Sequence, residues 1–260
     1  MHRRIFGHVF NLNFLSEIIY RYKNYMKNKD NSERISKVIA RSSQYSRRQV
    51  EQLIIEGRVR IDGKIIDRPN INVNAANKIL LDKKLINYKT QDEIFMFNKP
   101  RGCLVTHSDP EGRKTIFDLI PKKFEKYISI GRLDYNSEGL LLITNNGDIK
   151  RYFELPKNNF ERSYKVKVQG KVDERIIKSL KKGLFINKIK YKPILALIDS
   201  ITPTYTWITM NLREGKNREI RNIFESFNMT VTRLIRISYG PYKLGKIQKG
   251  KIVKAKIIKK

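Results

Sequence analysis

The chain of 260 residues contains a single cysteine and only three histidines. One cysteine excludes an internal disulfide framework and any zinc or iron–sulfur site that needs several cysteines. The histidines are not grouped at ligand spacing, so no metal site is expected. No run of about 18 apolar residues is present that could span a bilayer. We therefore expect a soluble, cytoplasmic protein without a membrane partner.

Acidic residues are also scarce. The sequence has 25 Asp and Glu against 55 Lys and Arg, which gives a formal net charge of +30. So strong an excess attracts polyanions, among which nucleic acid is the commonest, with an anionic membrane surface as the main alternative. Because the sequence is also rich in Ile and Asn, part of the Lys content can reflect compositional drift. Clusters of Arg are therefore better evidence than the total charge.

Residues 1–31 differ from the rest of the chain. They are basic and loosely amphipathic, but they lack the compact apolar stretch and the small-residue cleavage site of a signal peptide. Three interpretations stay open: a disordered basic arm, a helix that docks on the body, or untranslated sequence ahead of a true start at Met26. The first and the third are favoured equally.

From Ser32 onward the apolar spacing becomes regular. ERISKVIARSS predicts an amphipathic helix, and a second helix is expected to start at Ser46, where Gln49 three residues later completes a capping-box signature. Asp62-Gly63, between two alternating runs, is a strong hairpin signal. We expect a helix–helix–hairpin domain over residues 32–82 and a polar linker over 83–91.

Basic residues concentrate on this small domain. A helix N-terminus carries outward N–H groups and a positive dipole end, and two Arg follow Ser46 there. The phrase SRRQVEQLIIEGRVRIDGK resembles the alpha-L RNA-binding motif, which is shared with a small-subunit ribosomal protein. The expected RNA-binding residues are Lys37, Arg41, Arg47, Arg48, Arg58 and Arg60.

Residues 92–260 are predicted to form the second and larger domain. Strand-like runs, among them residues 103–106, outnumber the helices expected at 148–155, 173–182 and 217–227, and the two do not alternate regularly. The pattern favours an α+β fold with a mainly antiparallel, mixed sheet, flanking helices and a central cleft, rather than a doubly wound nucleotide-binding fold.

Asp134 is the candidate for chemistry in this domain. It lies in GRLDYNSEGLLLITNNGD (131–148), in a polar turn between two apolar strands and two residues after Arg132. Catalytic carboxylates often occupy such loops, but a lone Asp in a turn is more often a cap, and it names no reaction.

At these residues the sequence resembles the RNA pseudouridine synthases, specifically the branch of small-subunit and large-subunit ribosomal enzymes. Within that branch it is similar to the ribosomal large-subunit pseudouridine synthase B group. The agreement continues in order along residues 33–260. The other similar stretches are FNKPRGCLVT (97–106), DPEGRKTIFDLIP (109–121), ERSYKVKVQG (161–170), and REGKNREIRNIF with RLIRISYG (213–240).

The resemblance implies that the protein isomerises a uridine of ribosomal RNA, in the large subunit, to pseudouridine. It implies Asp134 as the catalytic carboxylate, Tyr164 against the uracil, and Arg221 as the basic residue that keeps Asp134 charged. Arg132, Lys99 and Pro100 are expected to bind the substrate. The reaction needs no cofactor and we expect a monomer.

Two alternatives follow from the same residues. A non-catalytic RNA-binding ribosome-assembly factor could use the same small domain, although an inactive relative would be expected to have lost Asp134, Tyr164 or Arg221. An RNA methyltransferase would need a Gly-rich cofactor loop after a first strand, which the sequence lacks. A close, at least half-buried ion pair between Arg221 and Asp134 is the sharpest structural expectation, because burial alone would protonate the Asp.

Overall fold

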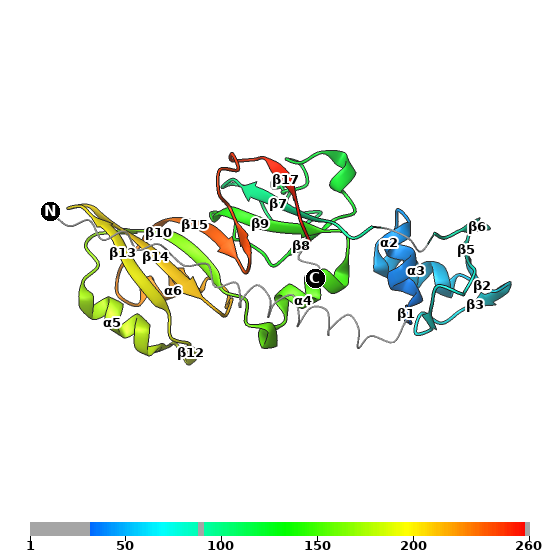
Figure 1. The fold of residues 1–260 in the computed structure, drawn as a ribbon, viewed down its shortest axis with the longest axis horizontal. Helices are drawn as coiled ribbons and strands as arrows, with labels where there is room; N and C mark the ends of the chain where they lie inside the picture. Colours follow the sequence, from blue (N-terminus) through cyan, green and yellow to red (C-terminus); the bar gives the residue numbers. More distant parts are fainter. Residues whose placement is uncertain (1–31, 88–90, 258–260) are drawn as a thin grey trace. The chain divides into compact units, whose positions relative to one another are not determined.

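The computed structural model describes residues 32–87 and 91–257 (Figure 1). The chain divides into two compact units: the second spans Asp92–Ala255, and the first precedes it and also includes Lys256 and Ile257. None of the helices in these two stretches is long and apolar enough to cross a membrane. The extension 1–31, including the alternative start at Met26, lies outside the described residues.

The first unit opens with the two predicted helices, α2 (Ile35–Ser42) and α3 (Arg47–Ile55). The Ser46 side chain accepts a hydrogen bond from the Gln49 N–H, and the Gln49 side chain accepts one from the Ser46 N–H, which confirms the capping box. The apolar face of both helices is buried, and it consists of Ile35, Val38, Ile39, Val50, Leu53 and Ile54.

Short strands complete this unit. Asp62 and Gly63 both have positive φ, as the predicted tight turn between β2 (Val59–Ile61) and β3 (Lys64–Ile66) requires. The four-stranded sheet has the order β3-β2-β5-β6, with β5 (Ile79–Leu81) and β6 (Lys84–Leu85) beyond β2. A separate pair joins β1 (Glu33–Arg34) to β4 (Asn72–Val73). The stretch expected as a linker from residue 83 therefore begins with a paired strand, β6.

The second unit is built on one nine-stranded mixed sheet, as predicted. Its main path runs β13-β14-β10-β15-β9-β7-β17, with β16 beside β15 and β8 beside β9. The strands are β7 (Ile94–Lys99), β8 (Ile128–Ile130), β9 (Glu138–Thr144), β10 (Arg162–Gln169), β13 (Leu195–Ile201), β14 (Tyr205–Leu212), β15 (Val231–Tyr239), β16 (Tyr242–Lys243) and β17 (Ile252–Ala255).

Three helices of the second unit fall where they were predicted. They are α4 (Gly147–Glu154), α5 (Glu174–Lys182) and α6 (Glu219–Glu225), accompanied by the 3-10 turns η1 (Lys122–Phe124) and η2 (Pro156–Asn158) and by a separate hairpin of β11 (Leu184–Ile186) and β12 (Ile189–Tyr191). The apolar run at 103–106 is not a strand, because only an isolated bridge from Leu104 to Thr115 forms there.

The sheet has a separate core on each of its halves. One contains residues of β10, β14, α5 and α6, and the other contains residues of β7, β9 and the segment around η1. Tyr164 on β10 packs against both. Between the halves, β9 and β15 form the parallel pair of a sheet whose other pairs are antiparallel.

Gly139 allows the two halves of the sheet to join. It has φ +98°, and a Cβ added there would lie 2.3 Å from the Arg236 carbonyl oxygen on β15. Any side chain at this position would therefore push β9 and β15 apart. The loop that carries Asp134 enters β9 immediately before this contact, so the catalytic candidate lies where the two halves meet.

Candidate active site

Asp134 lies in the loop between β8 and β9, which several hydrogen bonds hold in place. The Gly131 N–H donates to a carboxylate oxygen of Glu154 at 2.7 Å. Farther along, the Gly102 N–H donates to the Tyr135 carbonyl at 2.9 Å, and the Ser137 N–H donates to the Asp134 carbonyl at 3.0 Å. The backbone around Asp134 is thus fixed from both sides while its half-exposed side chain remains available.

Lys99 is the strongest of these anchors. Its side chain is fully buried, and Nζ lies 2.9–3.4 Å from four backbone oxygens, those of Pro100, Asp134, Tyr135 and Ser137. Burial lowers the pKa of this amine, while nearby Cys103 and Asp134 raise it in part.

Lys99 and Pro100 were predicted to bind substrate, but the donors of Lys99 are all directed inward, onto backbone oxygens. Pro100 contributes its carbonyl to the same cage, and neither residue is among those that line the cavity beside Asp134. The physical reason is that a buried ammonium must satisfy its donors locally, and the tight loop before β9 presents the carbonyls it needs.

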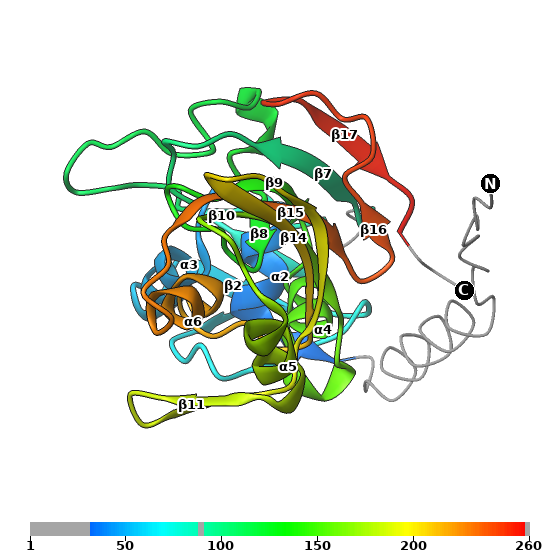
Figure 2. The ribbon, with the colours of Figure 1, turned by 90° about the vertical axis from the view of Figure 1, so that its left-hand side faces the viewer.

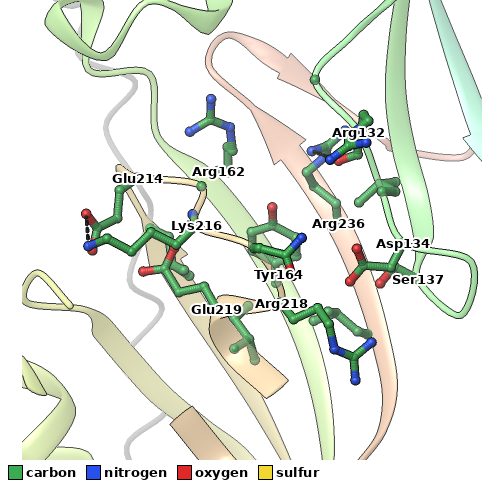
Figure 3. A pocket seen from close by; sticks show the side chains of 17 residues that line it. Arg132, Asp134, Ser137, Arg162, Tyr164, Glu214, Lys216, Arg218, Glu219 and Arg236 are labelled. Carbon is green, nitrogen blue, oxygen red and sulfur yellow. Dashed lines mark hydrogen bonds and ion pairs between the residues drawn. The ribbon is translucent and has the colours of Figure 1, made fainter. Parts of the chain in front are cut away.

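A cavity of about 180 Å³ opens beside Asp134 (Figure 3). This is the volume of about six water molecules, enough for one small planar ring. Tyr164 and Asp134 both line it, so the structure brings these two predicted residues together, and Arg132 lies at the same opening. The remaining charged lining residues are Arg162, Glu214, Lys216, Arg218, Glu219 and Arg236.

The expected ion pair between Asp134 and Arg221 does not form. Across residues 32–87 and 91–257, no hydrogen bond or ion pair involves the Asp134 carboxylate. The Arg221 guanidinium donates instead to the Val231 carbonyl at 2.8 Å and to the Asn136 carbonyl at 3.3 Å. Both Nη atoms of Arg221 therefore bind backbone oxygens, one of which belongs to the loop of Asp134.

Arg221 nevertheless acts on Asp134 through space. Burial and the neighbouring cation Arg218 lower the pKa of Arg221, whereas the Asp134 carboxylate raises it, so the two side chains lie within electrostatic reach. A guanidinium retains its charge under such shifts. Arg221 therefore supplies positive potential to Asp134 while it fixes the loop backbone.

Arg236 performs a similar task from β15. It is 2% exposed, its Nε donates to the Leu140 carbonyl at 2.7 Å, and its Nη1 lies 3.5 Å from the Arg132 carbonyl. Its Nη2 is buried and has no hydrogen-bond partner within the described chain. A second guanidinium thus faces the cavity with donor capacity left over.

Glu219, at the start of α6, is the unusual carboxyl group of the cavity wall. It is 4% exposed, and one of its oxygens accepts from the Lys216 N–H at 3.0 Å. Burial raises the pKa of Glu219 to about 7; the Lys216 N–H opposes this rise and the nearby Glu214 carboxylate adds to it. The two carboxyl groups of Glu214 and Glu219 together consequently hold a proton over part of the neutral pH range.

Arg218, Glu219 and Arg236 are among the lining residues that were not singled out from the sequence. All three lie in the stretches REGKNREIRNIF and RLIRISYG that carried the resemblance, which is the signal that could have found them. Spacing alone could not, because Arg236 reaches the cavity only through the parallel pairing of β15 with β9.

The basic residues predicted for the first unit are mostly paired with acids. Glu33 accepts from Lys37 at 3.0 Å and Arg41 at 2.6 Å, and Arg58 forms a two-pronged pair with Asp82. Burial would raise the pKa of Glu33, but these two cations hold it at about 2.

The other three predicted cations of this unit differ from one another. Arg47 lies 3.3 Å from Glu51. Arg60 donates to the Gly63 carbonyl at 3.1 Å, and neither Arg60 nor Arg48 forms an ion pair within the described residues. Both are exposed. Of the predicted RNA-binding residues, these two keep their full charge available.

Groups of three or more His, Cys, Asp or Glu arranged to hold a metal ion are absent from the described stretches. Cys103 is buried in the core beside β7, as expected of a structural cysteine, and burial raises its thiol pKa.

Comparison with known proteins agrees with this architecture. Residues 93–226 match the family model described as RNA pseudouridylate synthase, and residues 33–79 match that of the S4 domain. An uncharacterized RNA pseudouridine synthase of Rickettsia felis is 43% identical over 216 residues, covering 83% of this chain and 93% of the relative.

More distant matches point the same way. Ribosomal large subunit pseudouridine synthase B of Haemophilus influenzae is 41% identical over 231 residues, which cover 84% of this chain and 63% of that protein. A crystal structure of a pseudouridylate synthase matches with a TM-score of 0.60 at 25% identity, over 86% of this chain and 96% of the other.

The unpaired Asp134 carboxylate in a cavity with an excess of cations, on a mixed sheet preceded in the chain by a small domain of the S4 type, fits an RNA-modifying isomerase. The chain belongs to the RNA pseudouridine synthase family, and its first unit is an S4 domain.

Proposed function

We propose that this enzyme isomerises a uridine of large-subunit ribosomal RNA to pseudouridine, with Asp134 as the catalytic carboxylate. The observation that carries the proposal is the free Asp134 side chain, which shares a cavity with Tyr164 amid an excess of cations. The names of the Haemophilus influenzae, Pasteurella multocida and Yersinia pestis relatives, all ribosomal large subunit pseudouridine synthase B, support the choice of RNA.

The reaction breaks the N1–C1′ bond, turns the uracil and forms a C5–C1′ bond, after which the C5 proton leaves. Atoms and electrons balance without an oxidant, a reductant or an energy source. Asp134 acts either as a nucleophile or as a base toward the sugar, and it is regenerated at the end. Because no described residue pairs with its carboxylate, both oxygens are available for this work.

Access to Asp134 requires the target base to leave its stack, at a cost of about a few kcal/mol. Tyr164 lies on the cavity wall, where its ring can pack on the uracil and its hydroxyl can take the C5 proton late in the reaction. Arg132 is exposed at the opening, where it can fill the space that the base leaves or hold the neighbouring phosphate.

Two measurements test this function together. Tritium release from C5-labelled uridine in an unmodified large-subunit transcript reports the isomerisation itself. Chemical adduct formation followed by primer extension, on ribosomal RNA from cells with and without the gene, identifies the modified position. No release from any ribosomal RNA would contradict the proposal and would favour the ribosome-assembly role. Sedimentation of the purified enzyme tests our expectation that it acts as a monomer.

A further inference from the structure

The hairpin of β11 and β12 has no place in the chemistry described above. It follows α5 directly and projects away from the sheet (Figure 2). Asn187 and Lys188 form its turn, both with positive φ. The hairpin forms its own two-stranded sheet and is not part of the nine-stranded one.

Its surface is basic and partly apolar. Phe185 is 73% exposed, which is unusual for so large a ring. Five exposed lysines surround it in the sequence, and none forms an ion pair with a described residue. They are Lys181, Lys182, Lys188, Lys190 and Lys192.

A hollow of about 600 Å³ lies between this hairpin and α6. Such a volume is within the usual range of ligand sites, about 300–1,000 Å³. The hairpin contributes Ile186, Asn187, Ile189 and Tyr191, and Asn222, Glu225 and Ser226 lie opposite. The amides of Asn187 and Asn222 and the hydroxyl of Ser226 are groups that can bind the edge of an unstacked base, and the exposed ring of Phe185 on the hairpin offers a face for stacking.

Hydrogen bonds join the hairpin beside the hollow to the wall of the Asp134 cavity. Glu214 and Lys216 line that cavity, and both also hold the hairpin strand. One Glu214 oxygen accepts from the Lys192 N–H at 2.7 Å, and Lys216 donates to the other at 2.8 Å and also to the Lys190 carbonyl. The helix between the two sites also links them, because Arg221 reaches the loop of Asp134 and Asn222 lines the hollow.

The two sites lie against the same helix, because residues of α6 line both. An α-helix is about 10–12 Å across, a span that a few nucleotides of single-stranded RNA can cover. We propose that the hollow between the hairpin and α6 is a second RNA subsite, which takes one unstacked nucleotide near the target uridine while the hairpin lysines bind the adjacent phosphates. This inference rests on the proposed function.

Charge complementarity is the reason for choosing RNA as the occupant. Unpaired lysines around an exposed aromatic ring suit a polyanion with stacking bases, and each phosphate they neutralise releases a counterion. A protein partner or a second copy of this chain would have to leave these cations unmatched or supply acids against all of them. Glu225, at the rim, leaves the balance positive.

The first test removes charge without disturbing the hairpin. Lys188→Asn retains a residue that tolerates positive φ, and Lys190→Gln leaves the backbone carbonyl that Lys216 uses. The matched control is Lys122→Gln with Lys126→Gln, two exposed lysines in and beside η1. Both double variants lose two charges, so any difference reflects position.

Binding to an unmodified large-subunit transcript is measured across salt concentrations. The hairpin variant should lower the slope of log K against log salt by about 1.4–1.8, which corresponds to two lost phosphate contacts. It should raise KM roughly tenfold and leave kcat within about twofold. The control should behave like wild type. Equal slopes and equal KM for the two double variants would overturn the inference.

A second variant tests the hollow itself. Asn187→Gly preserves the turn but removes the amide, so the salt slope should stay constant while affinity falls by roughly threefold to tenfold. Ultraviolet cross-linking of wild type should join RNA to Phe185, whose ring is exposed.

Two results would overturn the inference from other directions. Substitutions in the hairpin that change self-association in sedimentation and leave RNA binding intact would identify a protein contact. A wild-type enzyme without tritium release would overturn the proposed function first and this inference with it. If the wild type is active but the hairpin substitutions change neither KM nor the salt slope, the inference alone is overturned.

Discussion

The cations of the S4 domain and the cations around Asp134 are held in different ways. In the S4 domain, Lys37 and Arg41 share the carboxylate of Glu33, and Arg58 is paired with Asp82. Around Asp134, backbone carbonyls hold Lys99, Arg221 and Arg236. The domain selected from its density of Arg is thus the one in which most of the predicted RNA-binding cations are paired with acids.

The difference is electrostatic as well as geometric. A carboxylate cancels the charge of its partner at a distance, whereas a carbonyl satisfies the donor and leaves the net charge in place. Asp134 consequently lies in a field of cations without being bound to any of them. The comparison predicts that the S4 domain affects mainly affinity and the Asp134 cavity mainly turnover.

Asp134→Asn should have the largest effect. We expect tritium release to fall by roughly 10³-fold or more, because the amide can act neither as nucleophile nor as base. RNA affinity should stay within about threefold, since phosphate contacts dominate it. Asp67→Asn, at an exposed carboxylate of the first unit, is the control. Turnover within tenfold of wild type would rule out the assignment of Asp134.

Substitutions of Arg221 should have the second-largest effect on turnover, and the loss should depend on which residue replaces the arginine. Arg221→Met removes both the charge near Asp134 and the donors to Val231 and Asn136, so we expect kcat to fall roughly 100-fold. Arg221→Lys retains the charge but loses the fork and should stay within about tenfold of wild type. The acidic limb of the pH–rate profile should move upward in the Met variant. Equal losses in the two variants would show that charge is irrelevant there.

Two pairs of substitutions in the S4 domain test which cations bind RNA. Arg48→Ala with Arg60→Ala removes the unpaired charges, and we expect KM to rise several-fold and the salt slope to fall by about 1.5. Lys37→Ala with Arg41→Ala should change binding less. It should lower Tm more, because it removes the two cations that hold down the pKa of the partly buried Glu33. The opposite order would mean that Glu33 releases its partners to RNA.

Glu219→Gln should have the smallest effect. The pKa of Glu219 is raised to about 7 in the folded protein, so the folded state binds more protons than the unfolded state between pH 4.5 and 7. Stability therefore falls as pH rises through this window, by roughly 1 kcal/mol between pH 6 and 8. The Gln variant should lose that dependence in urea unfolding at the two pH values. An unchanged slope with pH would show that Glu219 is ionised throughout.

Short sequence patterns predicted the elements that depend on interactions between residues close together in the sequence. The Ser46–Gln49 capping box, the Asp62-Gly63 turn and the three helices of the second unit all depend on neighbours within a few residues. The prediction of a strand at 103–106 was wrong, because an apolar segment can be buried in a loop as well as in a strand. The edge strand β13 shows a weak strand pattern, because its residues Leu195 and Leu197 are exposed.

The site was predictable only in part, for the same reason. Motif order identified Asp134 and Tyr164 correctly as neighbours in one cavity. What each cation binds depends on partners far away in the sequence: Lys99 meets carbonyls 35 to 38 residues on, and Arg236 one 96 residues back. No spacing rule encodes those distances, so the sequence did not reveal that the Lys99 amine is held by backbone carbonyls.

The burial of strand β9 affects how the active site responds to heating. All seven of its residues are buried, and it lies between β15 and β7 in the middle of the sheet. Segments of this kind open only with the whole domain, so their amide protons exchange with solvent last. The Asp134 loop runs directly into that slow-exchanging strand. On heating, activity should therefore persist until the domain unfolds as a unit, instead of fading earlier as it does when a catalytic loop is attached to a fraying edge.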